Sequence, residues 1–196
     1  MDQNTEIFGN RVPKDYFVTT GYGETNAGSG IDPWETGAYD LALLMAQIEN
    51  FNVVEYTSVL PPEARERPID EVKHLFHHGA VLETIMASIN GYQYDHLCAG
   101  VGRIQVREKS DGVHIGGFAA EYEGHAPKEN AEGILHNSLM GIFDRRYSPD
   151  EYETFDEKFD IIEFDVQKKY GTALAAIAFV TYIYPEVPES FKEVSG

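Results

Sequence analysis

The chain has 196 residues, 42% of them hydrophobic, which is enough to bury a substantial core in one domain. Its 15 basic and 33 acidic residues give a formal net charge of −18, which argues against nucleic acid and anionic membranes as partners. The longest uninterrupted apolar run, residues 173–180, is far too short to span a membrane. The N-terminus shows no secretory signal, and a single cysteine, Cys98, fits a reducing compartment, so we expect a cytoplasmic protein.

The first strand is predicted over residues 16–22, and a helix follows it. Asp32 provides an acidic cap, Pro33 occupies the first helical position and Glu35 stands three residues after the cap, a pattern typical of helix starts. Apolar residues then recur at i, i+3, i+4 and i+7 spacing, so the helix to about residue 50 is expected to pack one face on a sheet. The residues of this expected buried stripe are Leu41, Leu44, Met45 and Ile48.

The rest of the chain is predicted to consist mainly of strands, near residues 51–59, 79–90, 94–107, 113–123, 158–168 and 172–183. Asp111–Gly112 and Tyr170–Gly171 are interpreted as the turns of two hairpins. A second amphipathic helix is expected to start near Pro127 and to bury Leu135, Leu139, Ile142 and Phe143. Two helices on a large, mostly antiparallel sheet system predict an α+β fold in layers.

A hydroxyl pair, Thr57-Ser58, lies near the end of the strand predicted over residues 51–59, shortly before Pro61-Pro62. Neither proline has a backbone N–H to donate to a strand neighbour, so the strand must end there. The Thr57–Ser58 peptide bond is therefore held at the end of a rigid element. The Ser58 hydroxyl can then attack the Thr57 carbonyl, convert the amide to an ester and leave by β-elimination. Hydrolysis of the resulting dehydroalanine gives a chain that begins with a pyruvoyl group. On residue types alone, an ordinary turn is the alternative.

Several segments around this pair match a known family in their order and spacing along the chain. The chain resembles the pyruvoyl-dependent arginine decarboxylases, notably their bacterial branch, which has Thr-Ser at the cleavage point. The resemblance runs from about Tyr16 to Tyr182. It rests on residues 40–63, on HGA at 78–80, on GGFAAEYEG at 116–124 and on KYGTA at 169–173.

The resemblance implies a four-layer αββα sandwich with mostly antiparallel sheets. It implies a single domain over residues 1–196 that cleaves itself into a β subunit, residues 1–57, and an α subunit, residues 58–196. The cofactor would be a covalent pyruvoyl group derived from Ser58, which forms a Schiff base with arginine and yields agmatine and CO2. The cleaved protomers would associate as trimers, with assembly beyond the trimer left open.

The same resemblance implies roles for four residues. Thr57 is the residue before the cleavage point, and Asn52 corresponds to an asparagine that assists self-cleavage. Glu121 corresponds to the proton donor, and its apolar neighbours should desolvate the carboxyl and keep it protonated to higher pH. An exposed strand-face glutamate is the alternative for Glu121. Asp40 corresponds to an acidic residue that binds the substrate guanidinium, with a simple polar residue beside the helix stripe as the alternative.

One distance argument concerns Asn52 and Ser58. Both point to the same face of a strand by parity, but six extended residues separate them by roughly 20 Å. They cannot serve one site within one chain unless the strand bends sharply. A cyclic homo-oligomer with sites at its subunit boundaries would bring Asn52 from a neighbouring chain.

Other functions remain open at this stage. The same chemistry could act on another cationic or aromatic amino acid. A self-cleaving hydrolase with a free N-terminal Ser58 is a second class, and an unprocessed structural relative is a third. His74, His77 and His78 are interpreted as a solvated turn, and no metal site is predicted. Acid resistance and polyamine supply are both open as physiological roles.

Overall fold

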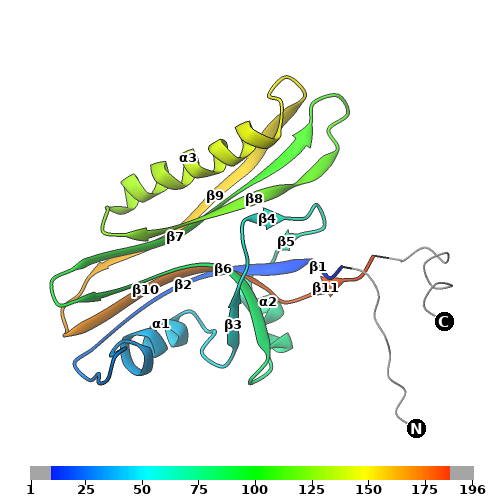
Figure 1. The fold of residues 1–196 in the computed structure, drawn as a ribbon. Helices are drawn as coiled ribbons and strands as arrows, with labels where there is room; N and C mark the ends of the chain where they lie inside the picture. The colour runs from blue at the N-terminus through cyan, green and yellow to red at the C-terminus, as the bar shows by residue number, and fades with distance from the viewer. Residues whose placement is uncertain (1–9, 186–196) are drawn as a thin grey trace, which may run out of the picture.

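Two sheets stacked face to face form most of the structure, a computed structural model that describes residues 10–185 (Figure 1). The five-stranded sheet has the order β3 (Asn52–Glu55), β6 (Val81–Tyr92), β10 (Tyr170–Phe179), β2 (Asp15–Thr25) and β5 (Arg65–Glu66). The four-stranded sheet has the order β4 (Val59–Leu60), β8 (His114–Gly124), β7 (His96–Glu108) and β9 (Tyr152–Asp165). Two short strands, β1 (Val12–Pro13) and β11 (Tyr182–Ile183), pair separately.

Most strand pairs are antiparallel, so the mixed α+β class predicted from the sequence is confirmed. The parallel pairs are β3 with β6 and β2 with β5. Alternation along β10 explains how the sheets stack: Ala175 and Ile177 face the core between the two sheets, whereas Leu174 and Ala178 face the outer side. A strand covered on both faces is buried throughout, as β10 is.

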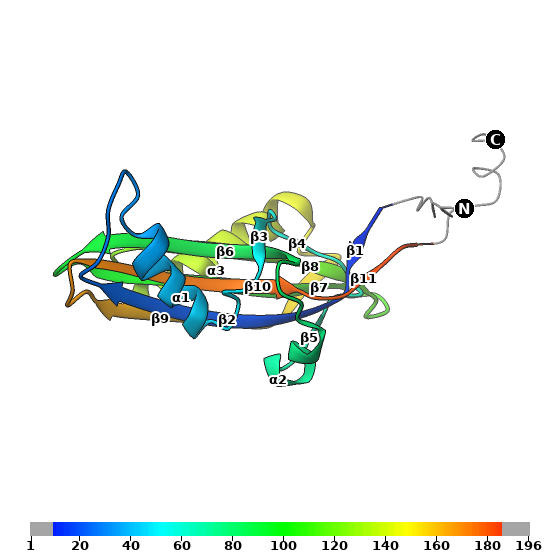
Figure 2. The same cartoon turned by 90° about the horizontal axis from the view of Figure 1, so that it is seen from below.

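The helices lie on the outer faces of the two sheets (Figures 1 and 2). They are a π-helical turn, η1 (Glu35–Tyr39), followed by α1 (Asp40–Met45), α2 (Ile69–Val72), the 3₁₀ turn η2 (Lys73–Leu75) and α3 (Lys128–Arg146). Helix α3 covers the four-stranded sheet, begins after Pro127 and buries Leu135, Leu139 and Phe143 as predicted, with Ile142 partly buried. No helix within residues 10–185 is long and apolar enough to cross a membrane. The N-terminus interpreted above lies outside the described residues.

The buried face of α1 differs from the predicted stripe. Leu41, Leu44 and Met45 are 40%, 53% and 50% exposed, and the helix instead buries an alanine row, Ala38, Ala42 and Ala46. The predicted cap is present, since Asp32 accepts hydrogen bonds from the backbone amides of Trp34 and Glu35, at 3.2 and 3.3 Å. Ile48, just after the helix, is the only member of the predicted stripe that is buried.

Two glycines of β2 explain why alanines face the sheet. A Cβ on Gly21 would lie 2.1 Å from the Ala42 carbonyl oxygen, and one on Gly23 would lie 2.3 Å from that of Ala38. The helix backbone therefore lies almost directly on the strand, at a distance where only small side chains fit between them. The larger Leu and Met side chains are turned outwards for this reason.

The strand predicted over residues 51–59 is divided between the two sheets. Its first part, β3, pairs with β6 in the five-stranded sheet, and its last part, β4, pairs with β8 in the four-stranded sheet. The hairpin predicted at Tyr170–Gly171 is also wrong, because these residues begin β10 while the preceding strand, β9, belongs to the other sheet. The Asp111–Gly112 turn does join a hairpin, between β7 and β8. Periodicity finds strands but does not report a change of sheet.

Candidate active site

The Thr57–Ser58 bond lies in the crossing segment, residues 56–58, which carries the chain from one sheet to the other. On the side of the five-stranded sheet, the Tyr56 backbone N–H donates to the Thr84 carbonyl at 2.6 Å. On the side of the four-stranded sheet, the Ser58 carbonyl accepts from the Ala119 N–H at 2.9 Å. Thr57 is exposed and Ser58 is half-buried. The bond is therefore held between two sheets rather than at the end of a single strand.

Strand β4 fixes the chain after Ser58. Val59 and Leu60 pair with Phe118 and Gly117 of β8, and the prolines follow immediately, as the predicted termination requires. Gly116 has a φ of +122°, and a Cβ there would lie 2.7 Å from the Leu60 carbonyl oxygen. A glycine at this position lets β4 lie close to β8.

Glu121 lies on β8, two residues beyond Ala119, which places its Cα about 7 Å along the strand from the residue that binds Ser58. Its register partner is Val101, a residue of the core between the sheets, so the carboxyl points towards the space between the sheets. Burial raises the pKa of Glu121 above its ordinary value, and the negative charges of Glu55 and Glu123 raise it further. The residue is nevertheless exposed to solvent in the single chain.

Glu123 shares that face of β8 but is tied to the other sheet. Its Oε2 accepts a hydrogen bond from the Ser88 backbone N–H at 3.2 Å. Strand β3 pairs with β6 only over residues 81–84, so the Ser88 N–H lies on a part of β6 that β3 does not cover. Glu123 therefore accepts a hydrogen bond from a backbone amide at the edge of the five-stranded sheet, which gives it a structural role.

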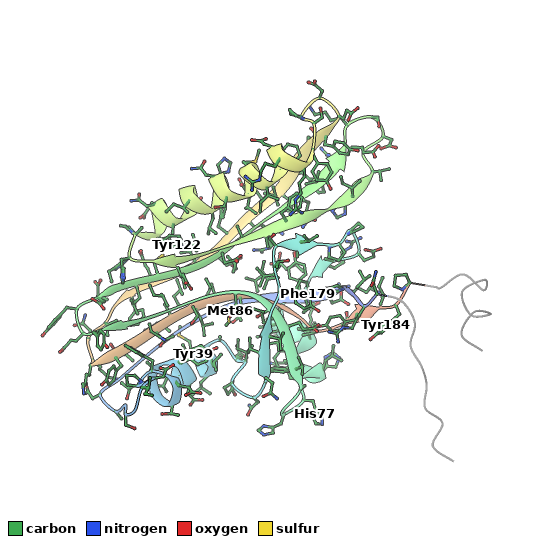
Figure 3. The ribbon with its side chains drawn as sticks, viewed as in Figure 1. Tyr39, His77, Met86, Tyr122, Phe179 and Tyr184 are labelled. Atoms are coloured by element: carbon green, nitrogen blue, oxygen red, sulfur yellow. The ribbon has the colours of Figure 1, made fainter. Side chains whose placement is uncertain are left out.

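A cavity of about 280 Å³ opens beside these carboxylates, on the side of α1. Two of its lining residues also act on the β8 carboxylates: the charge of Glu55 raises the pKa of Glu121, and the Ser88 backbone N–H donates to Glu123. Tyr39 and Met86 of its wall are labelled in Figure 3. The lining residues are Asp32, Glu35, Tyr39, Glu55, Met86, Ser88 and Asn90.

No sequence motif marks the acidic residues of this cavity as functional. Asp32 and Glu35 fit a helix start, and Glu55 fits a strand pattern. Glu55 stands three residues before Ser58 on the predicted strand, and this spacing is the one signal that could have drawn attention to it. Their convergence depends on η1, which packs on β2 and β10, facing β3 and β6 across the cavity, and no local pattern predicts this.

Asn52 and Asp40 do not join Ser58 and Glu121 within the chain. Asn52 begins β3, and its side-chain amide donates to the Gly79 carbonyl at 2.9 Å. Asp40 is the exposed first residue of α1, and its carboxylate forms no hydrogen bond or ion pair with residues 10–185. Strand parity does not relate Asn52 to Ser58, because the strand is broken between them.

The histidines near residues 74–78 and Cys98 are the other candidate functional groups. His78 Nδ1 lies 3.0 Å from the Asn50 side-chain oxygen, and His77 Nδ1 lies 3.0 Å from the His78 carbonyl. Over residues 10–185, no group of three or more His, Cys, Asp and Glu side chains is arranged to hold a metal ion. Cys98 is fully buried, and burial raises the pKa of its thiol to about 11, so it is a poor nucleophile.

Comparison with known proteins gives one consistent result. A family model described as pyruvoyl-dependent arginine decarboxylase matches residues 15–184. The pyruvoyl-dependent arginine decarboxylase of Chlamydia trachomatis serovar L2 is 38% identical over 188 residues, covering 89% of this chain and 94% of that protein. That of Chlamydia caviae is 38% identical over 190 residues with the same coverage. A protein of the same enzyme name from Methanopyrus kandleri is 33% identical over 94 residues, 48% of this chain and 55% of its own.

Proposed function

Because this chain belongs to the pyruvoyl-dependent arginine decarboxylase family, we propose that it cleaves itself between Thr57 and Ser58 and then converts arginine to agmatine and CO2. The family makes it a carboxy-lyase with a covalent pyruvoyl group. The observation that supports the position of that group is the crossing segment, in which Ser58 is bound to β8 close to Glu121. We further propose that the stacked sheets with α1 and α3 outside them form the four-layer αββα sandwich of the family.

Self-cleavage would divide the single domain into residues 1–57 and 58–196. The Ser58 Oγ attacks the Thr57 carbonyl carbon, and the amide bond breaks as the ester bond forms. Loss of the Ser58 Cα proton then breaks the ester, which releases the Thr57 carboxylate and leaves a dehydroalanine. Water replaces the nitrogen of that residue, ammonia leaves, and the longer chain begins with the pyruvoyl group.

The residues around Ser58 fit this group and its reaction. The pyruvoyl group supplies a carbonyl that binds the substrate amine and takes up the electrons released as CO2 leaves. Glu121 holds the proton that the substrate Cα receives afterwards. Its raised pKa supports this role, because a general acid must stay protonated near the working pH.

Arginine specificity is assigned to Asp40, with one alternative. A guanidinium is best bound by a carboxylate that can accept two hydrogen bonds. The Asp40 carboxylate is exposed and has no partner among residues 10–185, so it is free to bind a cation. The acidic cavity lined by Asp32, Glu35 and Glu55 is the alternative guanidinium site within the same chain.

We propose that the active site is shared between chains in a trimer. Asp40 lies beside Leu41, Leu44 and Met45 on the exposed side of α1, and exposed apolar clusters commonly mark interfaces. A second copy that covers this cluster would bring Asp40 and Asn52 to the Ser58 of its neighbour. A cyclic assembly repeats one such contact at every boundary. The single buried cysteine accords with a cytoplasmic location.

Intact-mass measurement of the purified protein tests the proposed cleavage. We expect fragments of residues 1–57 and 58–196, the larger one lighter by one ammonia than the same fragment with an N-terminal serine. A free Ser58 amine would support the self-cleaving hydrolase instead. A single intact chain would support an inactive structural relative. The Ser58→Ala variant is the control and should neither cleave nor decarboxylate arginine.

Mixed oligomers test the shared site. Asp40→Asn and Glu121→Gln chains with different affinity tags are co-expressed, and oligomers that contain both tags are isolated. If each site takes Ser58 and Glu121 from one chain and Asp40 from the next, every trimer that contains both variants has one restored site of three, so the isolated mixed trimers should regain about one third of the parent activity. Mixed oligomers as inactive as either parent variant would place both residues of a site in the same chain.

A further inference from the structure

Glu83 of β6 is a buried carboxylate between the two sheets. The residue is 6% exposed, and its register partners are Val54 of β3 and Phe179 of β10. Of these, Phe179 is labelled in Figure 3. Its Oε1 forms an ion pair with Arg11, whereas the buried Oε2 has no hydrogen-bond partner among residues 10–185. Burying a carboxylate costs several kcal/mol, so its retention at this position needs an explanation.

Arg11 connects Glu83 to the crossing segment. Its guanidinium lies 4.4 Å from the centre of the Tyr182 ring and donates to the Tyr56 hydroxyl at 3.4 Å. The Tyr56 ring lies 5.8 Å from that of Phe179, the strand neighbour of Glu83. Burial raises the pKa of Tyr182 to about 12, so this phenol stays neutral beside the arginine. Arg11 therefore bridges a buried carboxylate and the side chain of Tyr56.

Tyr56 immediately precedes Thr57, the residue whose carbonyl is attacked. Its backbone is bound to Thr84 and its hydroxyl to Arg11, while Ser58 is bound to Ala119 on the opposite sheet. Only Thr57 and its two peptide bonds are left between these anchors. Holding an attacking atom and its target in place is a recognised source of rate acceleration.

We propose that Arg11 and Glu83 are positioning residues for self-cleavage, which act by holding Tyr56 so that the Thr57 carbonyl stays against the Ser58 hydroxyl. This inference rests on the proposed cleavage between Thr57 and Ser58. Arg11 and Tyr56 belong to the shorter fragment, and Glu83 and Tyr182 belong to the longer one. The same contacts therefore hold the end of the shorter chain in place after cleavage.

A second ion pair offers a matched control. Arg67 donates to Asp15 at 2.9 Å, and this pair also joins the two fragments, since Asp15 precedes the cleavage point and Arg67 follows it. It lies where β2 meets β5, on the side of the five-stranded sheet opposite β3. Loss of Arg67 should weaken the contact between the fragments without affecting Tyr56.

The test follows self-cleavage over time in newly synthesised full-length chain, by intact mass. We expect Arg11→Met to slow cleavage by about 10–100-fold, the equivalent of a lost charged hydrogen bond, and Arg67→Met to change it less than twofold. Tyr56→Phe removes only the hydroxyl contact and should slow cleavage a few-fold. The melting temperature of each variant in the Ser58→Ala background shows how much stability it loses.

The outcomes separate positioning from stability. Slower cleavage in Arg11→Met and Tyr56→Phe, with Arg67→Met at the parent rate, supports the proposal. Cleavage at the parent rate in both Arg11→Met and Tyr56→Phe would overturn it, and so would equal slowing in Arg67→Met. Tyr56→Phe decides the matter if Arg11→Met does not fold. An uncleaved parent chain would instead overturn the proposed self-cleavage, and this inference with it.

Discussion

The two long edges of the stacked sheets differ in how their charges are arranged. At the β5–β9 edge, Arg103 is 3% exposed and donates to the Glu66 carboxylate at 2.8 Å and to Asp160 at 2.6 Å. Lys158 adds a contact to Glu66 at 3.3 Å. This edge is closed by charges that neutralise one another across the two sheets.

Apart from the Arg11–Glu83 pair beside the crossing segment, the charged groups described at the β3–β4 edge are carboxylates. Glu55, Glu121 and Glu123 lie there, and none of them forms an ion pair among residues 10–185. The chain itself crosses between the sheets at this edge, through residues 56–58. The edge that only holds the sheets together is internally neutral, whereas the edge proposed to bind a cationic substrate leaves Glu55, Glu121 and Glu123 without a paired cation among residues 10–185.

The largest expected effect is on catalysis at the β3–β4 edge. Glu121→Gln should leave cleavage largely intact and lower arginine turnover by about 10²–10⁴-fold, because an amide cannot deliver the proton to Cα. Steady-state agmatine production, normalised to cleaved protein, measures this. Glu123→Gln is the matched control and should have a much smaller effect, since its side-chain oxygen can still accept from Ser88. The reverse result would make Glu123 the proton donor.

At the β5–β9 edge the largest effect should be on stability. Arg103→Met removes the buried cation that donates to Glu66 and Asp160, whose side chains are 34% and 41% exposed, and losing charge-assisted hydrogen bonds of this kind typically costs about 1.5–3 kcal/mol. Urea denaturation in the uncleaved Ser58→Ala background measures the free energy of unfolding of one continuous chain. Arg107→Met, which breaks an exposed pair with Glu153, should cost no more than about 1 kcal/mol. Equal losses in the two variants would contradict the contrast between the edges.

A smaller effect on catalysis is expected for Asp40. Asp40→Asn keeps the size of the side chain but removes its charge, which should weaken binding of the guanidinium by about 1.5–3 kcal/mol. The measurement is kcat/KM for arginine. Asp32→Asn is a suitable comparison, because asparagine preserves the helix cap while removing one charge from the acidic cavity. A larger loss in Asp32→Asn than in Asp40→Asn would move the guanidinium to that cavity.

The smallest expected effect concerns pH. Glu121 must be protonated to donate, so turnover should fall as pH rises through its raised pKa. Glu55→Gln removes one of the charges that raise this pKa and should shift the fall to lower pH, by less than about one unit. A pH profile of kcat for the parent and the variant measures the shift. A shift to higher pH would show that Glu55 does not act on Glu121 through its charge.

The helix after β2 shows which structural features local sequence patterns predict and which they do not. Its cap residue Asp32 was predictable, because capping is a local property, whereas the helix ends at Met45 and not near residue 50 as its apolar spacing predicted. Its buried face was not predictable, because the choice of Ala42 over Leu44 depends on Gly21, a residue of another element. Apolar spacing identifies a helix but does not distinguish an apolar face that packs on the sheet from one that stays exposed.

The sequence by itself identified Thr57-Ser58 as the candidate cleavage site, the prolines that follow it and the family to which they point. Only the tertiary structure showed that the pair crosses between two sheets and that Arg11 meets Glu83 beside it. The physical reason is the range of the interactions. Bond chemistry, capping and strand propensity act over a few residues, whereas the partners of a crossing segment come from elements far apart in the chain and meet only when the sheets stack.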